Sequence, residues 1–207
     1  MGDRQPEKKG DDEMRMIDLC SGLGGASQAM LDHGWDVMRI DNNPILSGVD
    51  KTIIHDILKV PDFDPCETLD LMWASPPCLE FSLAYNSPQA KAGRNKEHYE
   101  PDMSLIYKCI EIINQSRPKF WVLENVVGST KFINPILGPP RQIIGSYVLW
   151  GNFPFLRIDQ NLRAHKKSLD VNSKNPLRAN IRAQIPYPIS NAMRMAIEEQ
   201  TSIIDWC

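Results

Sequence analysis

The stretch MRMIDLCSGLGG, residues 14–25, decides the fold of this chain. Residues 14–19 alternate in polarity and then turn apolar, which predicts a strand, and the glycines that follow predict a tight turn. Residues 26–33 have a helical composition and end at Gly34, a residue type that is common just past a helix. A strand, a glycine turn and a helix in this order are typical of the start of an α/β fold.

Similar patterns continue along the chain. The run LDLMWA at residues 69–74 is almost continuously apolar, as in a strand that is buried on both faces of a parallel sheet. Asp102 can cap a helix that extends to Ser116, with Ile106, Ile110 and Ile113 on one face. Strands are predicted at residues 36–40, 52–54, 69–74, 119–125 and 146–150, and helices at 102–116 and 188–200. Strands that alternate with helices predict a Rossmann-like, doubly wound, mostly parallel α/β sheet.

Length and composition favour one compact domain. The chain has 207 residues, of which 42% are hydrophobic and 24% charged. Residues 1–13 are polar and lack apolar periodicity, so we expect a disordered tail before a single domain at 14–207. Residues 151–180 show no clear periodicity, and a long irregular stretch within a domain is typical of a functional or mobile segment.

The sequence disfavours export, membrane insertion and metal binding. It has no apolar run of the roughly 18 residues that a membrane span needs, and its charged start differs from a secretory signal. The five cysteines are odd in number and form no CxxC pair, and the four histidines show no metal-ligand spacing. We therefore expect a reducing, cytoplasmic setting and neither a disulfide framework nor a metal.

Positive charge is concentrated between Arg157 and Arg182. This stretch has seven lysines and arginines and two acids, so it carries +5, whereas the whole chain carries −3 at pH 7. A basic stretch on an acidic body favours a polyanion such as nucleic acid, although a solvated loop gives the same count.

Polar or glycine-bearing segments follow five predicted strands. In an open α/β sheet, ligands bind at the carboxyl ends of the strands, so these segments are the candidate site. The segments are residues 18–25, Asp41, Asp56, residues 75–82 and the pair Glu124-Asn125.

The glycine turn alone leaves three interpretations open. It is compatible with a dinucleotide site, with another nucleotide site, or with a tight turn that binds nothing. Its spacing is not GxGxxG, which argues against NAD, whereas Asp41 lies where an acid can bind ribose hydroxyls. Asp56 taken alone is better explained as a helix cap or a surface acid.

The segment ASPPCLEFS, residues 74–82, is the sharpest chemical feature. Two prolines fix the backbone before Cys78 and hold its thiol at the mouth of the sheet, where a thiolate can act as a nucleophile. A buried cysteine in a proline-rich turn is the alternative, and no histidine is placed to make a cysteine protease. Glu124 ends an apolar strand, where burial would raise its pKa and let it donate a proton, unless it merely caps the next turn.

In their order and spacing, DLCSGLGG, SPPCLEFS and ENV resemble the cofactor, Pro-Pro-Cys and glutamate motifs of the DNA (cytosine-5) methyltransferase family, over residues 16–126. The resemblance implies a methyltransferase fold, S-adenosylmethionine as methyl donor, and a cytosine swung out of its DNA stack. It implies that Cys78 attacks carbon 6 of the ring, that Glu124 protonates or hydrogen-bonds nitrogen 3, and that Asn125 orients Glu124 or the Cys78 loop. Carbon 5 then takes the methyl group.

The resemblance also implies which residues contact the two ligands. The loop at residues 83–101 would fold over the flipped nucleotide, and RAQIPYPISNA near the end resembles a divergent form of the last motif. The implied cofactor contacts are Asp18, Cys20, Ser21, Gly22, Leu23, Gly24, Gly25, Asp41, Asn42, Asp56, Ile57, Pro77, Tyr187 and Ser190. The expected substrate contacts are Pro76, Ser82, Arg94, Arg141, Arg163, Lys166 and Lys167.

The chain departs from the family pattern in several places. Cys20 stands where the family usually has an aromatic residue, Leu79 replaces a usual glutamine, and Arg141 is a candidate for a missing paired-arginine motif. The family's large target-recognition domain has no room here, and a reduced basic segment at about 151–182 stands in its place. We therefore expect weak sequence preference, steep salt dependence, and duplex or locally opened DNA as substrate.

Three other functions are weighed against DNA methylation. The same cysteine and glutamate chemistry can serve tRNA, so an RNA cytosine-5 methyltransferase is an alternative. A cofactor-binding subunit whose partner protein supplies target recognition is another, and an oxidoreductase would leave SPPCLEFS unexplained. A role in restriction-modification or viral self-protection would place the protein in a bacterial cell or a phage-infected host.

Overall fold

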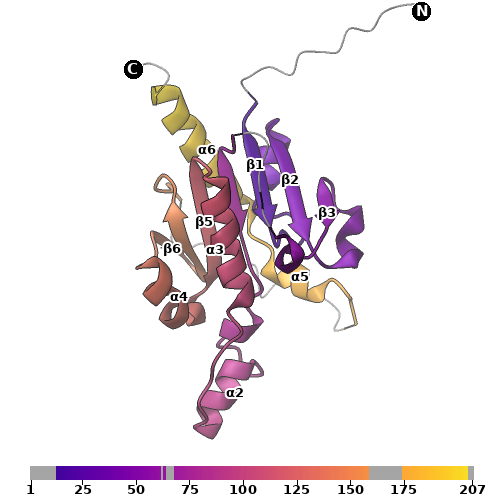
Figure 1. Ribbon diagram of the computed structural model, residues 1–207, viewed down its shortest axis with the longest axis vertical. Helices are drawn as coiled ribbons and strands as arrows, with labels where there is room; N and C mark the ends of the chain where they lie inside the picture. The colour runs from indigo at the N-terminus through magenta and orange to yellow at the C-terminus, as the bar shows by residue number, and fades with distance from the viewer. Residues whose placement is uncertain (1–12, 62, 64–67, 159–173, 205–207) are drawn as a thin grey trace, which may run out of the picture.

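The computed structural model describes residues 13–61, 63, 68–158 and 174–204 (Figure 1). The strands are β1 (Arg15–Leu19), β2 (Asp36–Asp41), β3 (Thr52–Ile54), β4 (Leu71–Ala74), β5 (Phe120–Val126), β6 (Gln142–Ile144) and β7 (Tyr147–Asn152). The α-helices are α1 (Gln28–Asp32), α2 (Pro88–Asn95), α3 (Ser104–Ser116), α4 (Thr130–Leu137), α5 (Arg178–Ala183) and α6 (Tyr187–Ile204). Short 3₁₀ helices are η1 (Pro44–Gly48), η2 (Ile57–Lys59), η3 (Leu79–Phe81) and η4 (Val127–Ser129).

The strands form one seven-stranded sheet in the order β3-β2-β1-β4-β5-β7-β6. The first five strands in this order are parallel to one another, whereas β7 is antiparallel to both β5 and β6. The chain moves outward in one direction from β1 to β3 and in the other from β4 onward, so a topological switch point lies between β1 and β4. The predicted doubly wound, mostly parallel, Rossmann-like sheet is confirmed.

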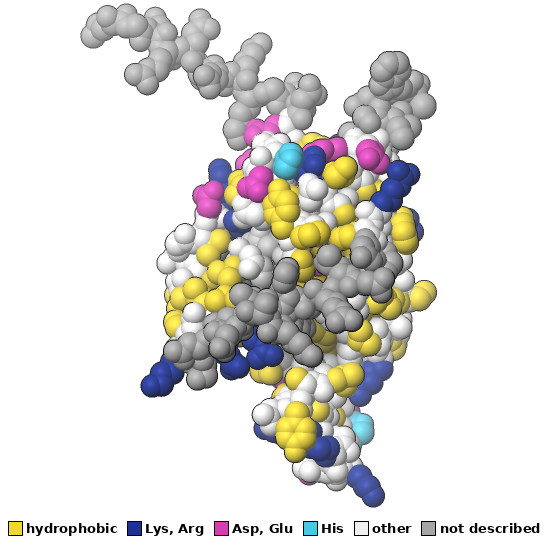
Figure 2. Space-filling view, turned by 180° about the vertical axis from the view of Figure 1, so that it is seen from behind, with side chains coloured by type: hydrophobic (Ala, Val, Ile, Leu, Met, Phe, Trp, Pro, Cys, Tyr) yellow, Lys and Arg dark blue, Asp and Glu magenta, His cyan; other side chains and the backbone are white. Residues whose placement is uncertain are grey.

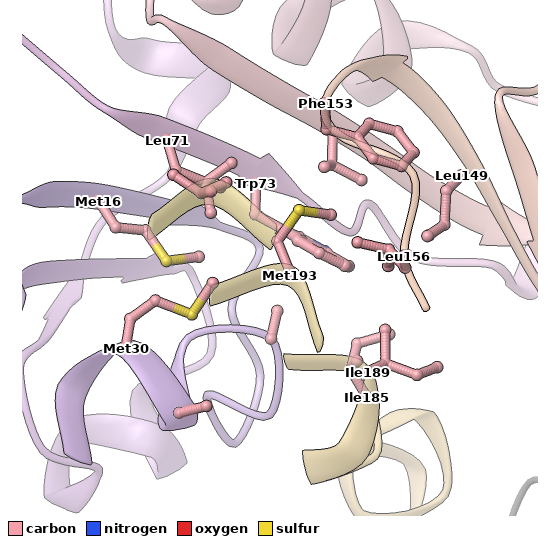
Figure 3. Packing of buried hydrophobic residues seen from close by; sticks show 14 of the residues in the cluster. Met16, Met30, Leu71, Trp73, Leu149, Phe153, Leu156, Ile185, Ile189 and Met193 are labelled. Atoms are coloured by element: carbon pink, nitrogen blue, oxygen red, sulfur yellow. The ribbon is translucent and has the colours of Figure 1, made fainter. Parts of the chain in front are cut away.

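Alternating strand residues feed two cores, one on each face of the sheet. On one face, Met16 and Trp73 pack with Met30 of α1 and Met193 of α6, as Figure 3 shows. On the other face, Ile17 and Met72 of the strands pack in a second cluster with the buried side of α3, which comprises Ile106, Cys109, Ile112 and Ile113. The strands are therefore buried on both faces, as the apolar run at 69–74 predicts.

The structure corrects the start and the buried face of the helix that was predicted at 102–116. Helix α3 starts at Ser104, because Asp102 accepts a hydrogen bond from the Ser104 backbone nitrogen at 2.8 Å in a turn that precedes the helix. Ile110 is only partly buried, and Cys109 and Ile112 occupy the centre of the buried face instead.

Four elements escaped the sequence patterns. The expected loop at 83–101 contains α2, and the expected irregular stretch at 151–180 begins with the end of β7 and ends in α5. Strand β6 has three residues, and α4 contains Pro135, so neither shows a usable periodicity. These elements are short, and contacts with the rest of the fold determine them.

Within the part of the chain that the structure describes, no helix is long and apolar enough to cross a membrane.

Candidate active site

A cavity of about 690 Å³ opens at the carboxyl edge of the parallel strands. Ligand pockets typically have volumes of this order. The cavity is bounded by the glycine turn after β1, the ends of β2, β4 and β5, the turn between β6 and β7, and α5. The predicted site residues that line it are Cys20, Ser21, Gly22, Leu23, Gly25, Asp41, Asn42, Asp56, Ile57, Pro76, Pro77, Cys78, Ser82 and Glu124.

Other predicted site residues do not line the cavity, and the structure gives four of them different surroundings. Ser190 is buried between α6 and α1, where its hydroxyl donates to the Ala26 carbonyl and accepts from the Ala29 nitrogen. Arg141 donates to the Phe153 carbonyl at 2.6 Å. Gly24 packs against the Arg39 guanidinium, and Asp18 is fully buried beneath the turn. The others outside the lining are Arg94, Asn125 and Tyr187, whereas Arg163, Lys166 and Lys167 lie outside the described residues.

The backbone of the glycine turn is tied to β2. Gly22 donates from its backbone nitrogen to Asp41 Oδ2 at 2.9 Å, and Ser21 donates to the Ile40 carbonyl. Cys20, Gly22 and Gly24 all have positive φ. Glycine adopts this conformation without steric cost, which explains the glycines at 22 and 24. The turn therefore curls toward the end of β2 and leaves its backbone facing the cavity.

Ser21 carries a buried polar group that the fold does not use. Ser21 is one of the residues that line the cavity, and its Oγ atom is buried without a hydrogen-bond partner. A buried hydroxyl without a partner is costly unless a ligand supplies one. The Oγ atom of Ser21 therefore indicates that a polar group of a ligand binds at the glycine turn.

Cys20 and Cys78 both line the cavity but differ in their surroundings. A hydrogen bond with Cys109, followed by burial, raises the pKa of the Cys20 thiol well above its usual value. Cys20 is therefore protonated at neutral pH and is a poor nucleophile. Cys78 is half-buried at the start of η3, directly after the two prolines that follow β4.

Asn125 connects β5 to the loop that carries Cys78. Its side chain is buried and donates from Nδ2 to the Pro76 carbonyl at 3.0 Å, while its Oδ1 accepts from the Val126 nitrogen at 2.9 Å. Both hydrogen bonds fix the amide in one orientation. Asn125 therefore acts as a positioning residue for the loop, outside the cavity itself.

Glu124 precedes Asn125 in β5 and lines the same cavity as Cys78. Its side chain is 8% exposed. Burial, together with the nearby charge of Glu124, raises the pKa of Tyr147 to about 12, so Tyr147 stays protonated next to the carboxyl group. The two residues come from adjacent antiparallel strands, β5 and β7.

Sequence reasoning missed several residues of the cavity. Ser146 and Tyr147 reach it because β7 runs antiparallel to β5, which brings the β6–β7 turn to the carboxyl edge. The signal was the pair Gly145-Ser146 at the start of the predicted strand at 146–150. Ala183 and Gln184 reach it from the end of α5 and the segment after it, which is too short for a periodic signal, whereas Arg182 belongs to the predicted basic segment.

A buried polar network supports the glycine turn from below. Ser27 donates to Asp18 Oδ2 at 2.7 Å, and Arg39 donates to Ser27 Oγ at 2.8 Å and to the Gly24 carbonyl at 3.1 Å. Burial raises the pKa of Asp18 to about 7, against the opposing effects of Ser27 and Arg39. Asp18 therefore positions the turn through Ser27 and titrates close to neutral pH.

Replacing Asp18 with asparagine should flatten the pH dependence of stability. Folding raises the pKa of Asp18 from 3.8 to about 7. The stability that the wild type has with Asp18 protonated is therefore fully present below pH 4 and is lost as the pH rises through 7. The free energy of unfolding of Asp18→Asn, relative to the wild type, should rise by up to about 4 kcal/mol between pH 4 and pH 8. Urea unfolding at several pH values measures this slope. A parallel dependence for both proteins would contradict the raised pKa.

Replacing Gly25 with alanine should push the glycine turn away from the segment that precedes α6. A Cβ atom at Gly25 would lie 2.5 Å from the Ile185 carbonyl oxygen and 2.9 Å from its nitrogen, and backbone cannot move aside cheaply. We expect a loss of about 1–3 kcal/mol in the free energy of unfolding. Gly48→Ala is the matched control, because a Cβ atom there meets nothing within 4 Å. Equal urea midpoints for the two variants would refute the close packing.

Similar proteins are known for the part of the chain that contains the glycine turn, Cys78 and Glu124. The family model for C-5 cytosine-specific DNA methylases matches residues 14–134. A probable DNA (cytosine-5)-methyltransferase of Frog virus 3 is 31% identical over 121 residues, which cover 54% of this chain and 53% of the viral protein. The type II methyltransferase M.AquIA of Picosynechococcus is 25% identical over 132 residues, and these cover 56% of this chain and 50% of that protein. The type II methyltransferase M.DdeI of Desulfomicrobium norvegicum is 28% identical over 130 residues, 56% of this chain and 28% of that protein. The chain thus spans about half the length of the first two of these relatives.

Proposed function

Because the chain belongs to the C-5 cytosine-specific DNA methylase family, we propose that it transfers a methyl group from S-adenosylmethionine to carbon 5 of cytosine in DNA. The observation that carries the proposal is the single cavity, which joins the glycine turn to Cys78 and Glu124. One ligand held at the turn and another held at Cys78 would meet in this space.

The residues at the glycine turn fit S-adenosylmethionine. The unpartnered hydroxyl of Ser21 and the exposed backbone of the turn suit the amino acid end of such a ligand. Asp41 and Asp56 offer carboxylates for ribose hydroxyls and adenine nitrogens, and Ile57 offers an apolar wall for a ring. When bound there, S-adenosylmethionine supplies an activated methyl group.

Cys78 and Glu124 would act on the cytosine ring from opposite sides. The Cys78 thiolate forms a bond to carbon 6, and the ring electrons that this bond displaces make carbon 5 nucleophilic. Glu124 donates a proton or a hydrogen bond to nitrogen 3, which stabilises the charge that develops there. After methylation, loss of the proton from carbon 5 breaks the bond to sulfur and releases Cys78. Asn125 holds the Cys78 loop in place through Pro76.

The basic segment would hold the DNA through its phosphates. Of its described side chains, Arg182 lines the cavity, and Lys174 and Arg178 lie nearby in the chain. A short basic segment supplies phosphate contacts and little base readout, so we propose weak sequence preference with steep salt dependence. Because this segment offers few side chains for base readout, a subunit whose partner protein supplies target recognition is the second candidate.

The experiment incubates the protein with S-adenosylmethionine and unmethylated duplex DNA, opened DNA or tRNA, and quantifies 5-methylcytosine after digestion by mass spectrometry. We expect product in DNA and none when the cofactor is omitted. Product in tRNA alone would replace the proposal with RNA methylation. Cofactor binding without product in any nucleic acid would favour the subunit that needs a partner.

A further inference from the structure

Residues 79–99 form a lobe that projects from the catalytic end of the cavity. The lobe begins directly after Cys78 and contains η3 and α2, and Figure 1 shows α2 well away from the sheet. Leu79, Ser82 and Ala84 of the lobe line the cavity. Whatever occupies the cavity at Cys78 therefore has this lobe as its neighbour.

The lobe exposes large apolar side chains beside the cavity. Tyr85 is 74% exposed, and Leu79 and Leu83 are exposed to nearly the same degree. Exposed apolar groups close to a binding site are typical of a surface that contacts a ligand. The aromatic member of the group, Tyr85, follows Ala84 at the cavity wall.

A cation covers one face of the Tyr85 ring. The guanidinium carbon of Arg94 lies 4.0 Å from the ring centroid. Because the ring has two faces and the residue is largely exposed, its other face is open to solvent. Residues 88–96 carry Lys91, Arg94 and Lys96 and no acid, and Figure 2 shows Lys and Arg side chains beside hydrophobic ones at this end of the molecule.

Hydrogen bonds within the lobe hold this pair on a fixed frame. Ser87 caps α2 by accepting from the Ala90 nitrogen at 3.3 Å and donates to the Ser82 carbonyl. Tyr99 donates from its hydroxyl to the Glu80 carboxylate at 2.6 Å, which joins the two ends of the lobe. Tyr85 and Arg94 are therefore held on a braced element whose first residues, after Cys78, line the cavity.

We propose that Tyr85 and Arg94 form a stacking platform for an unpaired base of single-stranded DNA, adjacent to the target cytosine. Bases stack on aromatic rings and on arginine planes whatever their sequence, and nearby lysines neutralise the phosphates. In a duplex the flanking bases already stack on each other, so the platform selects locally opened DNA. The inference rests on the proposed function for the identity of the target base.

The test measures binding of a fluorescent single-stranded oligonucleotide with one central cytosine by anisotropy, with the duplex and the RNA of the same sequence alongside. Tyr85→Ala should weaken binding of the single strand about tenfold, and Tyr85→Trp should restore it. Tyr107→Ala is the matched control, because Tyr107 is exposed on α3 outside the lobe and should leave binding unchanged. Oligonucleotides with an abasic site on either side of the cytosine identify the stacked base. The oligonucleotide that lacks the stacked base should bind to the wild type and to Tyr85→Ala with equal affinity, because it offers nothing to stack on Tyr85.

Equal binding of the single strand by Tyr85→Ala and Tyr107→Ala would overturn the inference. If Tyr85→Ala weakened duplex binding as much as it weakens binding of the single strand, the preference for opened DNA would be overturned. If Tyr85→Ala weakened RNA binding more than binding of the single-stranded DNA, the platform would be assigned to RNA. The binding measurement needs no turnover, so failure of this inference can be distinguished from failure of the proposed function. Absence of 5-methylcytosine with the Tyr85 effect intact refutes methylation alone.

Discussion

Replacing Cys78 with alanine is expected to reduce cytosine methylation by about 10⁴-fold or more while leaving the fold intact. The reason is chemical, because carbon 5 of cytosine is a weak nucleophile until a group adds at carbon 6. The substitution removes a single sulfur atom from a half-buried position in a loop that Asn125 holds through the backbone of Pro76. Circular dichroism and cofactor affinity should therefore stay close to those of the wild type.

The measurement is the initial rate of 5-methylcytosine formation under saturating cofactor. Cys78→Ser separates shape from chemistry, because it keeps a side chain of similar size but a hydroxyl is a far weaker nucleophile. Cys109→Ala is the control, since Cys109 lies on the buried face of α3, where loss of its side chain should lower stability and leave turnover largely unchanged. Substantial product from Cys78→Ala would show that another group adds to the ring.

A substrate analogue reports the covalent step directly. With fluorine at carbon 5 of the target cytosine, no proton can leave after methyl transfer, so the bond between sulfur and carbon 6 cannot break by elimination. The wild type should then form a protein–DNA complex that survives denaturation, and Cys78→Ala should form none. A trapped complex that persists in Cys78→Ala would move the nucleophile to another residue.

The parallel part of the fold could be predicted because its strands are buried on both faces. Runs such as LDLMWA are almost continuously apolar, as a strand between two layers of helices requires, and β1 to β5 lie within two residues of the predicted ranges. The antiparallel edge was harder to predict, since β6 has three residues and, among the described strands, pairs with β7 alone. Helices α2 and α5 are short, so caps and contacts that a single sequence does not reveal determine them.

The site was predictable where topology alone gathers residues. The carboxyl ends of parallel strands share one edge, so Asp41, Cys78 and Glu124 had to lie close together once the sheet was assigned. The burial of Asp18 and Ser190 was not predictable. Asp18 faces Ser27 beneath the turn, and Ser190 is fixed by the contact between α6 and α1, two helices that lie far apart in the sequence.

Replacing Glu124 with glutamine is expected to lower the rate of methyl transfer about 10²- to 10³-fold and to change cofactor affinity little. Glutamine fits the same buried position and can still donate a hydrogen bond to nitrogen 3, but it cannot transfer a proton. Single-turnover rates measured by mass spectrometry separate this effect from DNA binding. The fluorinated substrate should still be trapped by Glu124→Gln, only more slowly, because Cys78 remains.

Tyr147→Phe is the control for Glu124, since it keeps the ring beside the carboxyl group and removes only the hydroxyl. We expect a change of less than about tenfold for this variant, because it affects the surroundings of Glu124 and leaves the carboxyl group itself in place. A rate for Glu124→Gln within threefold of the wild type would contradict the proton transfer. Activation of the ring would then depend on the addition of Cys78 alone, and the burial of Glu124 at the end of β5 would be a requirement of the fold.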